Sequence, residues 1–189
     1  MQTQEQIQLI NDTINKTKEN LKSSAPNFIF WGALIAVLSL IHYGFPDFIQ
    51  QTRYSVLIYW VAIPVIGMVL TVIYNIKTRK QTGYETHMGR ALKIIWGVFN
   101  VAWMLLVVIS ILKNQNPVDS ILFLLGVVLT MTGLLIRFKP ISFGGVAVIA
   151  CSVLLVYNPE VNSLLINGIA AFLGLFLPGL ALLYSKSNV

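Results

Sequence analysis

Charged residues are scarce in this sequence. Only 11% of its 189 residues are Asp, Glu, Lys or Arg, whereas 56% are hydrophobic. Soluble domains typically carry about 25% charged residues. Six runs between Ser23 and Ser185 contain no charged residue at all, and they are 24, 23, 19, 17, 20 and 25 residues long. Because so short a chain cannot hide this much apolar surface from water, an ordinary soluble fold is excluded.

The sequence also lacks most side chains that carry chemistry. Cys151 is the single cysteine, so neither an internal disulfide nor a thiolate zinc cluster can form within one chain. The two histidines, His42 and His87, are expected at opposite ends of the membrane-spanning helices, which rules out a shared metal in one subunit. His42 is expected at the lipid interface beside Tyr43. The apolar runs contain no acid or strong base of the kind that intramembrane proton chemistry uses, so we expect no enzyme, metal site or cofactor.

What the sequence does contain predicts an all-α, polytopic membrane protein. A bilayer core about 30 Å thick requires roughly 20 apolar residues per helix. Only helices and closed barrels satisfy their backbone hydrogen bonds in lipid, and the sustained alternation of a barrel strand is missing. The six expected transmembrane helices cover residues 28–43, 54–76, 91–112, 117–136, 140–157 and 161–184.

The basic residues predict the orientation. With a cytoplasmic N-terminus, eleven Lys and Arg residues fall on the cytoplasmic side and only Arg53 and Lys113 on the other. Short basic loops are retained in the cytoplasm during insertion. We therefore expect a multi-pass membrane protein, with the lipid bilayer as its surroundings and both termini cytoplasmic. The same clustering explains the net charge of +6 without a nucleic-acid partner.

The three outer turns share a pattern in which a proline precedes a carboxylate. These carboxylates are Asp47, Asp119 and Glu160. An acidic residue in the first turn of a helix is favoured by the helix dipole, so capping explains the pattern. The alternative is an outer acidic cluster that converges and attracts cations. Together with glycines repeated at similar intervals, the pattern predicts three αα-hairpins packed into one bundle.

Few polar residues enter the apolar runs, and they define a polar core or path. The candidates are Asn100, Thr130, Thr132 and Asn167. An asparagine deep in a membrane helix seeks an interhelical hydrogen bond, and Thr130 or Thr132 is the expected partner of Asn100. Structural bonding between helices is one interpretation, and contact with a ligand along a neutral path is the other. The prolines Pro64 and Pro178 predict kinks in the second and sixth helices.

Residues 1–24 are expected to form a cytoplasmic amphipathic helix, separate from the bundle of residues 25–189. Its apolar residues follow one another at spacings of three and four, which places them in one stripe on a helix. The stripe needs a partner, which is a second copy of the chain, another protein, the underside of its own bundle or the lipid headgroups. Its residues are Ile7, Ile10, Ile14 and Leu21, with Thr17 between the last two.

Three short motifs accompany this arrangement. They are Phe-Trp-Gly at 30–32 after the polar N-terminal helix, Arg-Phe-Lys-Pro at 137–140 before a Gly-Gly span, and Leu-Pro-Gly at 177–179. In these features the chain resembles a group of small, uncharacterised six-helix bacterial inner-membrane proteins. The resemblance covers nearly the whole chain and implies a fold and a location, but no activity and no functional residue.

From the residues we expect a protein without catalytic function. Its role would be that of a scaffold, a regulatory subunit or a partner-binding subunit, and the N-terminal stripe would be its contact element. The competing hypothesis is a small channel or facilitative transporter with a neutral polar path. A flux measurement would separate the two hypotheses.

Overall fold

The computed structural model describes residues 24–82, 87–113 and 115–185. Six helices in these ranges are long and apolar enough to span a membrane, which confirms the all-α class and the six predicted apolar helices. The N-terminal stripe lies outside the described residues. The elements are α2 (Ala25–Gly44), α3 (Pro46–Ile49), α4 (Arg53–Thr82), α5 (His87–Lys113), α6 (Val118–Leu135), α7 (Lys139–Tyr157), α8 (Ser163–Ala171), η1 (Phe172–Phe176) and α9 (Leu177–Tyr184).

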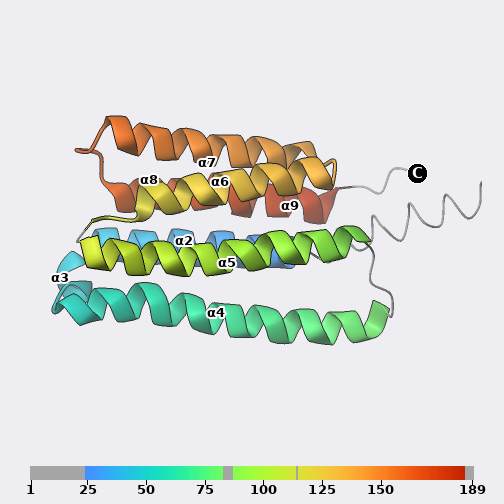
Figure 1. Cartoon of the computed structure of the whole chain (residues 1–189), viewed down its shortest axis with the longest axis horizontal. Coiled ribbons are helices and arrows are strands. Elements are labelled where there is room, and N and C mark those ends of the chain that lie inside the picture. Colours follow the sequence, from blue (N-terminus) through green and yellow to red (C-terminus); the bar gives the residue numbers. More distant parts are fainter. Residues whose placement is uncertain (1–23, 83–86, 114, 186–189) are drawn as a thin grey trace, which may run out of the picture.

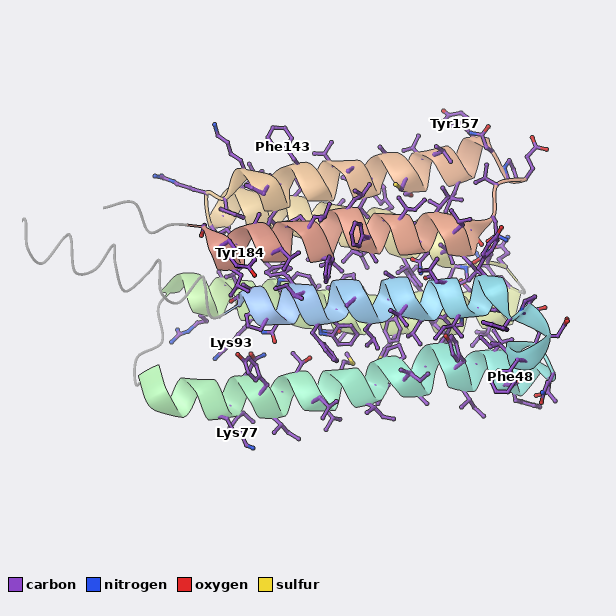
Figure 2. All side chains as sticks on the ribbon, turned by 180° about the vertical axis from the view of Figure 1, so that it is seen from behind. Phe48, Lys77, Lys93, Phe143, Tyr157 and Tyr184 are labelled. Carbon is purple, nitrogen blue, oxygen red and sulfur yellow. The ribbon has the colours of Figure 1, made fainter. Side chains whose placement is uncertain are left out.

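The long helices run along the long axis of the molecule (Figure 1). Helix α4 lies along one edge of the bundle and α7 along the opposite edge. Chain direction alternates from span to span, so the described ends collect into two groups. Figure 2 shows Lys77, Lys93 and Tyr184 at one end of the bundle and Phe48 and Tyr157 at the other.

The closest backbone packing joins α6 and α7. Glycines face the opposite helix at this contact: a Cβ added to Gly145 would lie 2.5 Å from the backbone nitrogen of Thr130, and one added to Gly126 would lie 2.8 Å from the carbonyl oxygen of Gly145. Small residues allow such approach between membrane helices. A short turn joins the two helices at Arg137, which adopts a positive φ of 54°. Phe138 N–H bonds to the carbonyl of Gly133 at 2.9 Å, so a Schellman motif ends α6.

A second close contact joins α2 to the sixth span, which consists of α8, η1 and α9. A Cβ on Gly179 would lie 2.9 Å from the backbone nitrogen of Ile29, and one on Gly32 would lie 2.8 Å from Cα of Phe176. The wider π-helical turn η1 ends at Phe176, two residues before Pro178. A proline has no N–H and its ring crowds the carbonyl four residues earlier, so a π turn is a suitable accommodation. Pro64 lies inside the continuous helix α4.

The apolar core lies among α2, α6, α7 and the sixth span. Its most completely buried large side chains are Leu122, Leu129, Ile141 and Val148. By contrast, no residue of α5 between Gly89 and Lys113 is buried. Two whole spans, α4 and α5, therefore lie at the margin of the packed core.

The predicted arrangement of three hairpins is not confirmed. The tightest pairs are α6 with α7 and α2 with the sixth span, and neither is one of the expected hairpins. The physical reason is that a short turn fixes only the ends of two helices. The positions of small residues along their faces decide which backbones approach closely.

Candidate functional site

The structure does not gather the predicted polar core residues into one path. Asn100 donates its amide hydrogen to the carbonyl of Trp96 at 2.8 Å, and the Thr130 hydroxyl donates to the carbonyl of Gly126 at 2.8 Å. Both bonds stay within their own helix. Thr132 is only 2% exposed, and its hydroxyl has no partner within the described residues. The bond expected from Asn100 to either threonine is therefore wrong, because the carbonyl one turn earlier in the same helix satisfies the side chain.

Asn167 does bond between helices, but to a residue that the sequence did not single out. Its amide donates to the Ser39 hydroxyl at 2.9 Å. Ser39 is 1% exposed and Asn167 is 8% exposed. Gly168 lets α8 approach α2 here, since a Cβ at that position would lie 3.2 Å from Cβ of Ser39. This buried pair holds α2 against the sixth span. The sequence feature that could have indicated this bond is Ser39 itself, a serine within an apolar run.

The three outer carboxylates occupy different settings. Asp47 lies in the first turn of the short helix α3, and Asp119 lies in the first turn of α6. Glu160 precedes α8, which begins at Ser163 and is capped by the Asn162 side chain, so the expectation of a carboxylate in the first turn is wrong there. The turn at α3 and the turn after α7 lie on opposite edges of the bundle (Figure 1). Among the described residues, no group of three His, Cys, Asp or Glu side chains could hold a metal ion.

His42 is buried between α2 and α4, with 5% of its surface exposed. It lies in the last turn of α2, near the end of the span as expected, but aromatic rings of α4 cover it. The indole N–H of Trp60 donates to its Nδ1 at 2.9 Å. The ring of Tyr59 meets it edge to face, with centroids 6.0 Å apart, and the Tyr59 hydroxyl donates to the carbonyl of Leu38 at 2.9 Å.

This geometry assigns the tautomer of His42. An indole nitrogen can only donate, so Nδ1 must be the acceptor and the neutral ring carries its hydrogen on Nε2. The side-chain nitrogen of Gln50 lies 3.3 Å from Nε2 of His42. An amide nitrogen only donates, so the amide of Gln50 must be turned over for its oxygen to accept this hydrogen, and amide orientation is assigned from such networks. His42 is therefore held as a neutral ring that joins α2, α4 and the residue after α3.

Further polar contacts continue along the interface between α2 and α4. The Asn27 amide donates to the side-chain oxygen of Asn75 at 2.9 Å, and the Trp31 indole donates to the Thr71 hydroxyl at 3.1 Å. Gly67 lies between these contacts and the His42 cluster, with space for a Cβ limited by Leu34 at 3.1 Å. Large side chains thus link α4 to α2 over the length of the span.

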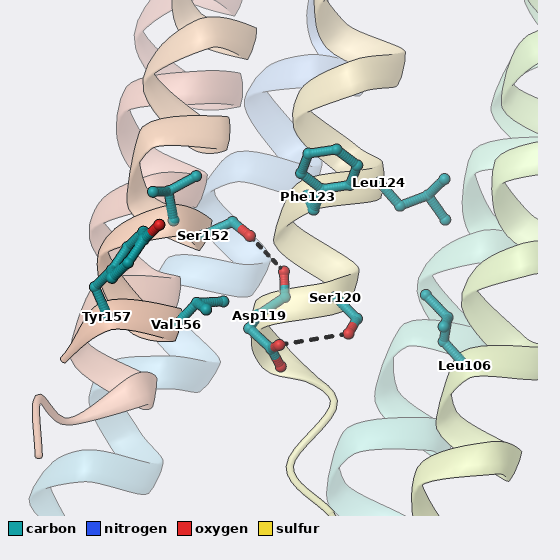
Figure 3. Close-up of a pocket in the computed structure, with 9 residues that line it drawn as sticks. Leu106, Asp119, Ser120, Phe123, Leu124, Ser152, Val156 and Tyr157 are labelled. Atoms are coloured by element: carbon teal, nitrogen blue, oxygen red, sulfur yellow. Dashed lines mark hydrogen bonds between the residues drawn. The ribbon is translucent and has the colours of Figure 1, made fainter. Parts of the chain in front are cut away.

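A groove of about 470 Å³ opens between α5, α6 and α7 (Figure 3). Leu106 of α5, Phe123 and Leu124 of α6, and Val153 and Val156 of α7 form its apolar wall. Its polar end is built on Asp119, Ser120 and Ser152. The Ser152 hydroxyl donates to the backbone carbonyl of Asp119 at 2.8 Å, which ties the first turn of α6 to α7. Tyr157 lines the groove at the end of α7.

No protein-family model, curated protein or solved structure matches this chain. The geometry combines neutral hydrogen-bonded pairs between helices with glycine contacts between backbones. Both kinds of contact hold helices together. The groove at Asp119 is the place where a carboxylate meets an open apolar wall.

Proposed function

We propose that this chain is a non-enzymatic integral protein of the bacterial inner membrane that acts as a scaffold, regulatory or partner-binding subunit. One observation carries the proposal: four spans are packed together through glycines and buried apolar side chains, while α5 contributes no buried residue. A packed apolar core with apolar helices at its margin suits a protein that works through contacts with neighbours. Lipid covers whatever part of this surface a partner leaves free.

The proposed orientation places both termini in the cytoplasm. Its support is the excess of Lys and Arg on one side and the position of Lys77, Lys93 and Tyr184 at the same end of the bundle (Figure 2). The test starts from Cys151→Ala, which removes the only thiol. A new cysteine at Gln51 should react with a membrane-impermeant maleimide added outside spheroplasts, and a new cysteine at Ser185 should react only after lysis. The reverse pattern would refute the orientation.

The partner-binding role is assigned to the N-terminal stripe. Replacing Ile10 and Ile14 together with Asp puts two charges on the apolar face, which should abolish co-purification of the partner or self-association. Membrane insertion should remain intact because the six apolar runs are unchanged. The matched control replaces Asn11 and Asn15 with Asp, which adds the same charge beside the stripe. An unchanged oligomer size and interaction profile in the stripe variant would contradict the role.

A second candidate is a small channel or facilitative transporter for a neutral solute. The favouring observation is the series of polar contacts between α2 and α4, from Asn27 and Asn75 at one end to His42 at the other. In this candidate function these residues would line the polar path, in place of Asn100 and the threonines expected from the sequence. Proteoliposome swelling in glycerol or urea tests it. A scaffold gives no flux above empty vesicles, whereas a channel gives flux that Asn75→Leu reduces.

A further inference from the structure

The polar end of the groove at Asp119 lies at one end of the bundle, which in the proposed membrane placement is the boundary between lipid tails and headgroups. Helix α6 begins at Val118 and α7 ends at Tyr157, so the polar end of the groove lies at the ends of two spans. Tyr157 is 80% exposed there, a position typical of the aromatic belt at a membrane surface. From this end the wall continues inward over Phe123 and Leu124 (Figure 3).

Within residues 24–82, 87–113 and 115–185, the carboxylate of Asp119 forms no ion pair. The hydroxyl of Ser120 donates to its Oδ2 over a long distance of 3.5 Å. Lys113, the nearest described cation along the chain, forms no ion pair with it. Asp119 is half-buried beside apolar side chains, where a charge is attracted more strongly to an opposite charge than in bulk water. The helix dipole explains a carboxylate in this turn, but it does not explain the groove beside it.

We propose that this groove binds a phospholipid whose headgroup carries an ammonium, with the ammonium at Asp119 and one acyl chain along the apolar wall. The inference rests on the proposed placement in a bilayer. Charge complementarity selects this occupant, because a carboxylate attracts an ammonium and repels a headgroup with only a phosphate charge. The volume of about 470 Å³ lies within the range of about 300–1,000 Å³ typical of small-ligand sites.

The test uses the full chain in nanodiscs of equal parts phosphatidylethanolamine and phosphatidylglycerol, with bound lipid identified by native mass spectrometry. The wild-type protein should retain phosphatidylethanolamine about three- to fivefold over phosphatidylglycerol, the preference that one partly exposed ion pair provides. Asp119→Asn should lose this preference. Asp47→Asn, which removes an exposed carboxylate at another outer turn, should keep it. Val153→Trp fills the wall and should lower retention of both lipids.

Three results would overturn the site. They are a wild-type protein without headgroup preference, an Asp119→Asn variant that keeps the wild-type preference, and dimers without bound lipid, which would indicate that a second copy covers the groove. Failure of the membrane placement is a separate result, because the protein would then not be incorporated into nanodiscs at all. Incorporation with no headgroup preference therefore refutes the lipid site alone.

Discussion

The contact between α6 and α7 predicts a specific sensitivity to one added methyl group. Gly145→Ala places a Cβ 2.5 Å from the backbone nitrogen of Thr130 and 2.8 Å from the carbonyl oxygen of Gly126. Both atoms belong to the backbone of a regular helix, so no side-chain rotation relieves the clash. Ordinary van der Waals contact begins at 3.4 Å, and the two helices must therefore separate locally by about 1 Å.

The magnitude follows from two opposing effects. Overpacking of a close contact costs about 1–3 kcal/mol, while replacing glycine by alanine inside a helix returns up to about 1 kcal/mol. Gly97→Ala is the matched control, because a Cβ at Gly97 meets nothing within 4 Å. It keeps the helical gain without the clash. The two variants should thus differ in the free energy of unfolding by about 1–3 kcal/mol, with Gly145→Ala the less stable.

The chain contains its own reporter for this experiment. Cys151 is the single cysteine, lies on α7 and is partly buried against the core. A thiol-reactive fluorophore therefore labels it faster as α7 separates from its neighbours on heating. For a chain of this size, 1–3 kcal/mol corresponds to roughly 2–12 °C in melting temperature. Circular dichroism of the same samples checks that labelling reports unfolding.

The reasoning would be refuted in either of two ways. One is a melting temperature of Gly145→Ala equal to or above that of Gly97→Ala. The other is a loss in Gly97→Ala as large as that in Gly145→Ala, which would show that the effect does not arise from helix contact.

Two further predictions concern hydrogen bonds between helices. Trp60→Phe removes the donor to His42 Nδ1 and leaves a buried acceptor unpaired, so the protein should lose about 1–3 kcal/mol of stability in thermal unfolding. The control Trp103→Phe should cost less, because the Trp103 indole makes no hydrogen bond within the described residues. Equal losses in the two variants would contradict the hydrogen bond assigned to Trp60. Ser39→Ala should lower the free energy of unfolding by about 0.6–1.7 kcal/mol. The double variant Ser39→Ala with Asn167→Leu should lose less stability than the two single variants together. Strict additivity in this double-mutant cycle would show that the pair does not interact.

Several features were predictable because they depend on local composition. Six runs without charge are each long enough to cross a bilayer, and the structure contains six apolar helices at nearly the predicted positions. Asp47 and Asp119 lie in first turns as expected. Glu160 does not, because the chain continues for two further residues before α8 begins at Ser163. A proline followed by a carboxylate therefore does not predict by itself the residue at which the helix begins.

The candidate site was less predictable, as two pairs of chemically identical residues illustrate. Asn100 bonds to its own helix and Asn167 bonds to Ser39 across an interface. Gly97 faces open space and Gly145 touches the backbone of α6. Nothing in the residue type separates the members of either pair. The same is true of His42, which becomes a buried acceptor only because Trp60 and Tyr59 project onto it from α4.

The sequence by itself determined that this chain forms six apolar helices, because hydropathy and charge are properties of each segment alone. Only the tertiary structure decided which helices touch, where α2 is bonded to its neighbours and where a groove opens beside Asp119. In a soluble protein the contrast between polar and apolar faces would have shown the inward side of each helix. In an apolar helix both sides are apolar, so contacts are selected by the relative rotation and depth of small and hydrogen-bonding residues on neighbouring helices.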